Sequence, residues 1–151
     1  MANPSPYKEG KNLNFMKPHK ARILAVQAIY QLDLQERSLE ELLSFDWIDY
    51  KVPEDEKKFA SDIIKGVREN LISLDKIIKE YSENWDFTRI SYVNKAILRI
   101  ALYQLIYMKD EIPAKVVIDE AIRLAKEFAE EESSRYINGM LDNYCKKNIK
   151  E

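Results

Sequence analysis

Residues 91–108 carry apolar side chains in almost every direction around a helical axis, and this pattern restricts the possible folds more than any other feature. A surface helix has one apolar stripe, whereas a helix that is apolar all round must be surrounded by other elements. Arg99 and Gln104 interrupt the run, which is shorter than the roughly 20 residues that a bilayer requires. The pattern therefore predicts a buried central helix rather than a membrane span.

The other segments show the periodicity of amphipathic helices. The first has Ile23, Val26 and Tyr30 on one line, with Lys20 and Gln27 on an opposite polar line. Only 3 glycines and 5 prolines occur among 151 residues, which favours long helices joined by short turns over sandwiches or βαβ units. We expect an all-α fold. Further inward lines are Phe59, Ile63 and Val67; Leu74, Ile77, Ile78 and Tyr81; Val117, Ala121, Leu124, Ala125 and Phe128; and Ile137, Met140, Leu141 and Tyr144.

Several short signals predict where helices begin and end. Ser38 and Glu41 have the spacing of a capping box, and Pro53 suits the first turn of a helix whose next three residues are acidic. An interruption is expected near residues 70–73. Ser133, preceded by three glutamates, is the expected N-cap of the last helix. Gly139 lies inside that helix, where we expect it to permit close approach of another backbone.

The ends of the chain and its cysteine content indicate the class of protein. Residues 1–16 contain prolines and a glycine without helical periodicity, which predicts a flexible arm, and they lack the apolar core of a secretory signal. The lone Cys145 excludes an internal disulfide framework, and no paired-cysteine metal spacing is present. We expect a cytoplasmic protein without a metal site or cofactor.

The charge is unevenly distributed along the chain. Residues 1–22 hold five basic side chains and one acidic one, a net charge of +4, although the formal charge of the whole chain is −2. A basic leading end on an acidic body could attract phosphates locally. The alternative is a solvated terminus that aids solubility.

Four segments carry a resemblance to a known family. They read ARILAVQAIYQLD at residues 21–33, NKAILRIALYQL at 94–105, IPAKVVIDEAIRLAKEF at 112–128 and RYINGMLD at 135–142. Together they resemble the NusB family of bacterial transcription antitermination factors, at intervals over nearly the whole chain after Lys17. The resemblance implies a bundle of about seven helices in one domain, residues 17–151, with two packed subdomains at about residues 17–70 and 73–148.

The resemblance also implies a function. NusB proteins bind single-stranded boxA RNA of ribosomal RNA leader transcripts together with NusE, a small-subunit ribosomal protein. The complex joins elongating RNA polymerase and other Nus factors to suppress termination, and no reaction is catalysed. The sequence leaves open whether the free protein is a monomer or a homodimer.

The family's RNA site falls on three groups of residues here. The basic cluster at the start of the first helix, interrupted by Pro18, would hold the phosphate backbone, while aromatic rings would stack on bases. For the rings, the alternative is an ordinary position at the margin of the core. For the lone histidine, the alternatives are a phosphate or ribose contact and a solvated bystander. The expected RNA-binding residues are Lys17, His19, Lys20 and Arg22; Gln27, Tyr30 and Tyr136; and Glu132 and Arg135.

Five further residues have expected roles in protein contact and in structure. Thr88 and Asn94, around the start of the central helix, are the expected contacts with NusE. Arg99, Glu120 and Asn138 lie inside the strongest motifs on otherwise apolar helices. Buried polar groups must satisfy one another, so we expect an Arg99–Glu120 pair with Asn138 nearby, fixing helix register rather than performing chemistry.

Two other classes of protein remain as alternatives. One group of ribosomal RNA cytosine methyltransferases carries a NusB-like N-terminal domain, but this sequence contains no glycine-rich cofactor loop and no cysteine in a catalytic context. We therefore expect no enzyme. The other alternative is a helical adaptor that binds proteins but not RNA.

Overall fold

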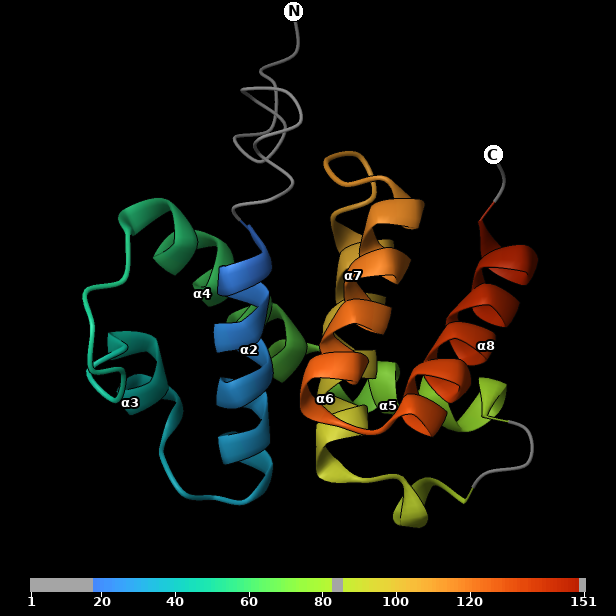
Figure 1. The fold of residues 1–151 in the computed structure, drawn as a ribbon, viewed down its shortest axis with the longest axis horizontal. Coiled ribbons are helices and arrows are strands. Elements are labelled where there is room, and N and C mark those ends of the chain that lie inside the picture. Colours follow the sequence, from blue (N-terminus) through green and yellow to red (C-terminus); the bar gives the residue numbers. More distant parts are fainter. Residues whose placement is uncertain (1–17, 83–85, 150–151) are drawn as a thin grey trace, which may run out of the picture.

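The computed structural model describes residues 18–82 and 86–149, and every regular element within them is helical, which confirms the predicted all-α fold (Figure 1). The expected arm at residues 1–16, and Lys17, lie outside these ranges. None of the described helices is long and apolar enough to cross a membrane. The elements are α2 (Pro18–Asp33), α3 (Leu39–Ser44), α4 (Glu54–Glu69), α5 (Leu71–Tyr81), the 3-10 helix η1 (Phe87–Arg89), α6 (Tyr92–Tyr107), α7 (Ala114–Phe128) and α8 (Glu131–Asn148).

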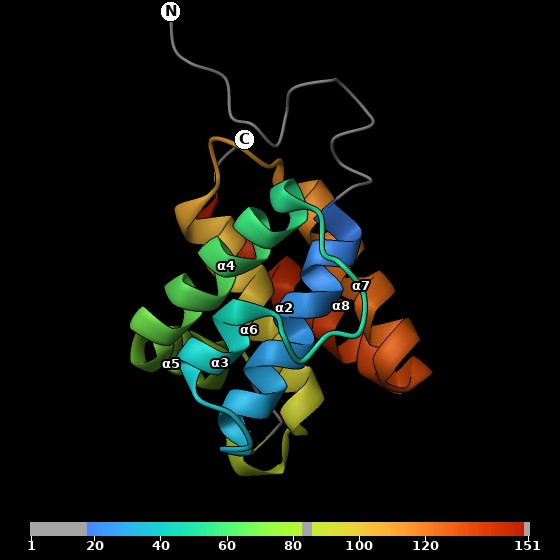
Figure 2. The ribbon, with the colours of Figure 1, turned by 90° about the vertical axis from the view of Figure 1, so that its left-hand side faces the viewer.

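Helix α6 is the central helix, as its all-round apolar pattern predicts. It packs against α2, α4, α5, α7 and α8. In Figure 1, α2, α3 and α4 lie on one side of it and α8 on the other, with α7 in front of it, and Figure 2 shows α2 and α4 covering it from the first side. Ser91 caps its N-terminus by accepting a hydrogen bond from the Asn94 backbone amide. The division into two subdomains near residues 70–73 stays a prediction.

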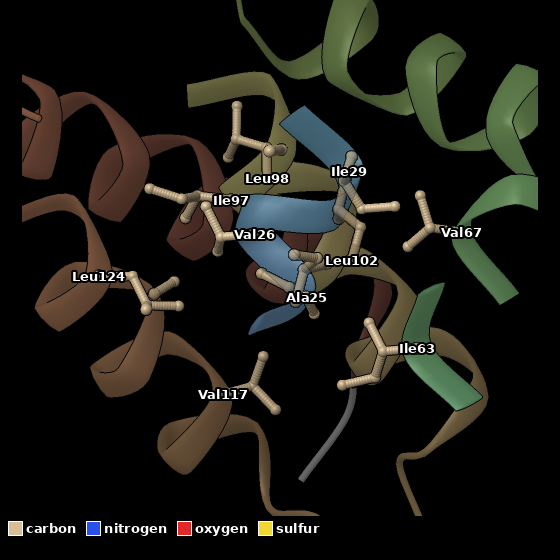
Figure 3. Close-up of a cluster of buried hydrophobic side chains, with 14 of the residues drawn as sticks. Ala25, Val26, Ile29, Ile63, Val67, Ile97, Leu98, Leu102, Val117 and Leu124 are labelled. Carbon is tan, nitrogen blue, oxygen red and sulfur yellow. The ribbon is translucent and has the colours of Figure 1, made fainter. Parts of the chain in front are cut away.

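The core joins α2 to its neighbours on three sides (Figure 3). Side chains of α2 meet those of α6, with α4 and α7 closing the cluster from either flank. Each fully buried Leu or Ile side chain contributes about 1.5–3 kcal/mol to stability. This burial fixes the rotation of α2 and so decides which of its polar residues face outward. The labelled side chains are Ala25, Val26 and Ile29; Ile97, Leu98 and Leu102; Ile63 and Val67; and Val117 and Leu124.

The predicted helix boundaries are confirmed in part. Ser38 and Glu41 form the expected capping box at the start of α3. The interruption after α4 is shorter than predicted, because Asn70 alone separates α4 from α5. Its side-chain amide donates to the carbonyl of Gly66, an end group of α4. The prediction of Ser133 as N-cap is wrong: α8 begins at Glu131, whose charge favours the positive end of the helix.

The prediction for Gly139 is wrong, and a different glycine permits a close approach. A β-carbon on Gly139 would meet nothing, because that position is exposed. A β-carbon on Gly66 of α4 would instead collide with the Tyr103 ring of α6. Gly66 therefore allows α4 and α6 to pack with a tyrosine between them.

The predicted Arg99–Glu120 pair does not form. Arg99 is buried and donates to both carboxylate oxygens of Asp75 on α5, at 2.7 and 3.0 Å, and to Asp33 at the end of α2, at 2.5 Å. Burial opposes its charge, but the hydrogen bonds and charges of the two aspartates outweigh burial and raise the pKa of Arg99. Glu120 instead faces the opposite end of α2, where it meets His19. Asn138 is exposed on α8.

Candidate nucleic-acid interface

His19, in the first turn of α2, contacts two glutamates of α7. Its Nδ1 lies 2.8 Å from Oε1 of Glu120, and its Nε2 lies 2.8 Å from Oε1 of Glu127. The two glutamates are two helical turns apart, so one imidazole spans them. With 6% of its surface exposed, His19 offers no free nitrogen, which corrects both the expected phosphate contact and the solvated alternative.

Arg22, one turn further along α2, is almost completely buried, with 1% of its surface exposed. Its Nε donates to Gln104 at 2.8 Å, and its Nη1 lies 3.4 Å from Glu120. The guanidinium also lies 5.1 Å from the centre of the Phe59 ring. Burial lowers the pKa of Arg22 to about 10 against the opposing effect of Glu120, so the group remains charged at neutral pH. Arg22 therefore joins α2 to α4, α6 and α7, and the expected RNA contact is wrong.

The positive charge at the start of α2 is mostly used inside the molecule. Lys20 is exposed, and it is the one member of the expected basic cluster that presents a cation at the surface among residues 18–82. On α7, Arg123 lies 3.7 Å from Glu120 and 3.4 Å from Glu127, adding a second arginine to the same carboxylates. The cluster is basic in the sequence, but in the folded protein the carboxylates of Glu120 and Glu127 offset most of its positive charge.

Tyr30 and Gln27 lie on the more open side of α2, and both are half-buried. They border an open cleft of about 460 Å³ that lies between α2, the segment after α3 and the end of α7. Trp47 and Phe128 contribute aromatic rings to its lining, and the Trp47 ring is held by a 2.9 Å hydrogen bond from its Nε1 to the carbonyl of Leu42. The cleft combines an amide with rings, which suits an unpaired base.

Trp47 and Phe128 had no predicted role at this site. Phe128 fits the inward line of α7 in the sequence, yet the end of that helix leaves the ring 38% exposed. Trp47 follows α3, which ends at Phe45 in a left-handed conformation with φ 58°. Nothing in the local sequence specifies that this turn carries the indole to α2.

Tyr136, Glu132 and Arg135 lie in the first turns of α8. Tyr136 is half-buried, and its hydroxyl is 2.6 Å from Oγ of Ser82. Burial raises the pKa of Tyr136, and the Ser82 hydrogen bond acts in the opposite direction. Glu132 and Arg135 are exposed. The tyrosine is thus held by its hydroxyl, while the two charged side chains face solvent.

Thr88 and Asn94 flank the start of α6. Thr88 is exposed, and its backbone amide and hydroxyl both donate to Asp86, at 3.0 and 2.8 Å. The Asn94 side-chain amide donates to the hydroxyl of Ser133 at 3.1 Å, which joins the first turns of α6 and α8. Thr88 therefore belongs to the surface, whereas Asn94 is used between two helices.

A comparison with known protein families identifies the family to which this helical chain belongs. The NusB family model matches residues 19–146. This chain belongs to the NusB family. The transcription antitermination protein NusB of Leptospira biflexa serovar Patoc is 45% identical over 131 residues, which cover 87% of this chain and 93% of that protein. The protein of the same name from Acetivibrio thermocellus is 39% identical over 126 residues, covering 83% and 86% of the two chains.

Solved NusB structures share the fold. The structure of T. maritima NusB has a TM-score of 0.78 and 34% identity, and the match covers 88% of this chain and 93% of the other. A chain from the crystal structure of antitermination factors NusB and NusE in complex with dsRNA has a TM-score of 0.77, with coverages of 89% and 98%. At 23% identity, that second match supports the fold alone.

The polar groups of this chain lie in the helices around α6 and at the edge of the cleft beside Tyr30. Within residues 18–82 and 86–149, no group of three or more His, Cys, Asp or Glu side chains could hold a metal ion. The sole histidine, His19, has both ring nitrogens in contact with carboxylates, those of Glu120 and Glu127. What the surface offers instead is Tyr30 with Gln27 beside an aromatic cleft.

Proposed function

We propose that this protein is a transcription antitermination factor that binds single-stranded boxA RNA in ribosomal RNA leader transcripts. It does so together with NusE, and the complex joins elongating RNA polymerase and other Nus factors in the cytoplasm. Membership of the NusB family supports the class of function. The observation that carries the RNA-binding part is the half-buried Tyr30 and Gln27 at the edge of an aromatic cleft.

The cleft supplies base recognition, and Lys20 supplies attraction to phosphate. An unpaired base stacks on Tyr30 and hydrogen-bonds to the Gln27 amide, with Trp47 and Phe128 excluding water. Lys20, two turns before Gln27 on α2, contacts the RNA backbone and carries no sequence information. Specificity therefore comes from the cleft, and the dependence on salt comes from the lysine.

The start of α8 and the 3-10 helix complete the interface. Arg135 is exposed and contacts phosphate, and Tyr136 presents the edge of a ring whose hydroxyl Ser82 holds. Glu132 limits nonspecific binding by repelling phosphate. Thr88 is an exposed residue beside α6, which supports its assignment to the NusE contact. Asn94 contributes to that contact indirectly, by joining α6 to α8 through Ser133.

The test is a titration of a boxA-type RNA and a scrambled RNA at fixed salt, each with and without NusE. We expect NusE to increase affinity for the boxA sequence more than for the scrambled one. Tyr30→Leu should weaken boxA binding roughly 5- to 150-fold, the value of one stacked base. Tyr50→Leu is the matched control, because Tyr50 is an exposed tyrosine in the α3–α4 connection.

Three outcomes would count against the proposal. Equal affinity for the two RNAs would remove sequence recognition. Binding of NusE together with no binding of either RNA would indicate the helical adaptor. Cofactor-dependent methyl transfer to ribosomal RNA by this chain would indicate an enzyme.

A further inference from the structure

We propose that Lys79, Phe87, Tyr92 and Lys95 form a second binding surface for single-stranded RNA, which extends the RNA path beyond Tyr30. We call these four residues the lysine–aromatic ridge. The inference deepens the proposed function and rests on it, since it assigns the nucleotides next to the boxA element to this surface.

The ridge is continuous in space although its residues come from three elements. The Nζ of Lys95 in α6 lies 4.3 Å from the centre of the Phe87 ring and 5.5 Å from the centre of the Tyr92 ring. The Nζ of Lys79 in α5 lies 4.9 Å from the centre of the same Phe87 ring. Tyr92 meets Tyr30 edge-on, with ring centres 6.5 Å apart. The ridge therefore begins where the cleft beside Tyr30 ends.

The backbone on which the two rings stand is fixed on both sides. Asp86 accepts hydrogen bonds from the amide and hydroxyl of Thr88, which caps η1 directly beside Phe87. These hydrogen bonds lower the pKa of Asp86, so the cap stays ionised at neutral pH. Buried Ile90 anchors the chain between η1 and α6, and Ser91 caps α6 immediately before Tyr92. Tyr92 remains 48% exposed on this support.

The charge of the ridge is available to an anion. Some exposed lysines elsewhere are paired with carboxylates one turn away, as Lys58 is with Asp62 and Lys115 is with Asp119. Lys79 and Lys95 form no ion pair among the residues that the structure describes, and each lies over an aromatic face instead. A ring polarises toward the cation without neutralising it, so a phosphate group can still approach.

This combination favours RNA over a protein partner. Sites for single-stranded nucleic acid combine cations that follow the backbone with rings on which successive bases stack. Lysine is depleted from protein–protein interfaces, whereas every ring of the ridge has a lysine beside it. Acidic residues bound the surface on one side: the Asn94–Ser133 bond places the start of α8, with exposed Glu131 and Glu132, next to the first turn of α6.

The experiment uses the full chain with NusE and two RNAs, a boxA-type element alone and the same element with single-stranded uridine extensions on both ends. We expect the extended RNA to bind more tightly to the natural protein. The double variant Phe87→Leu, Tyr92→Leu should lose this gain, a decrease of roughly 30-fold or more for the extended RNA because two stacking rings are removed, while binding of the short element changes little. Tyr50→Leu is the matched aromatic control.

A second variant keeps the test independent of folding. Lys79→Gln with Lys95→Gln leaves both rings in place, and it should also abolish the gain from the extension. Equal affinity of both double variants and the natural protein for the extended RNA would overturn the ridge proposal. A second contrary result would be that the double variants lose NusE binding but, without NusE, still bind the extended RNA more tightly than the short element. The ridge would then be a protein contact. A gain that depends on the ridge, but with no preference for boxA over a scrambled element, would instead overturn the proposed function and leave the ridge standing.

Discussion

The start of α2 and the lysine–aromatic ridge differ in a way that the sequence conceals. Residues 17–22 are the basic cluster of the sequence, yet His19 and Arg22 are buried against Glu120, Glu127 and Gln104. The ridge contributes two lysines that are 16 positions apart in the sequence, and both lie over rings, with no carboxylate partner in residues 18–82 or 86–149. A run of basic residues therefore does not predict a basic surface, because burial and partners decide which cations remain available.

The difference has a physical cause in the packing of α2. A charge can be buried only when it is paired and hydrogen-bonded, and α7 supplies two carboxylates two turns apart for that purpose. At the ridge, Lys79 is exposed and Lys95 is half-buried, and each amino group lies over an aromatic ring. The charges at the start of α2 therefore stabilise the fold, whereas the two lysines of the ridge are available to a ligand.

The largest expected effect is on stability, from Arg22→Ala. Removing the guanidinium leaves the side-chain oxygen of Gln104 without its donor and takes one cation away from the partly buried Glu120, so the free energy of unfolding should fall by about 3–5 kcal/mol. Urea unfolding followed by circular dichroism measures this. If stability were unchanged and only RNA binding weakened, Arg22 would be a surface contact and the comparison would fail.

A smaller loss of stability is expected from His19→Leu. The substitution removes the two imidazole nitrogens that contact Glu120 and Glu127, at a cost of about 1–3 kcal/mol. His19→Gln, which keeps one amide donor, should lose less. Urea unfolding should therefore give a lower midpoint for His19→Leu than for His19→Gln. Equal midpoints for the two variants would show that the two carboxylates do not need a hydrogen-bonding side chain at this position.

The ridge predicts an effect on salt dependence rather than on stability. Lys79→Gln with Lys95→Gln should reduce the slope of log affinity against log salt by roughly 1.4 for an extended RNA, since each contact with single-stranded RNA contributes about 0.7. Lys58→Gln with Lys115→Gln removes the same charge elsewhere and should leave the slope unchanged. Identical slopes for the two double variants would equate the ridge with any other lysines.

The smallest effect is expected from Lys20→Gln. Lys20 is exposed at the start of α2, so unfolding should change by less than about 0.5 kcal/mol, and the salt slope should fall by roughly 0.7. Anisotropy titrations at four salt concentrations resolve this difference. A loss of stability close to that of Arg22→Ala would mean that Lys20, too, has an internal role.

Local signals in the sequence predicted the fold better than they predicted the polar contacts. The capping box at Ser38 and the buried centre of α6 depend on neighbouring residues alone, and both are confirmed. The partners of Arg99 depend on how α5 and the end of α2 pack around α6, which periodicity does not specify. The collision that only Gly66 avoids depends on the same packing.

One signal for the buried arginine was present in the sequence. Arg22 lies four positions before Val26, which places it on the inward line of α2 rather than on its polar line. Ala21, Leu24, Ala25 and Ala28 leave few outward positions on that helix, and all four are buried. By contrast, nothing in the spacing of Lys79, Phe87 and Lys95 relates them, because three separate elements bring them together.

The central claim is that RNA binds along Tyr30 and the ridge and makes no contact with the buried side chains of His19 and Arg22. Chemical-shift mapping of the ¹⁵N-labelled protein with NusE and the extended boxA-type RNA tests it most directly. We predict large shifts for the backbone amides of residues 87–95 and unchanged signals for the Arg22 Nε–H group and the His19 ring. Shifts at Arg22 and His19, with residues 87–95 unaffected, would contradict the account.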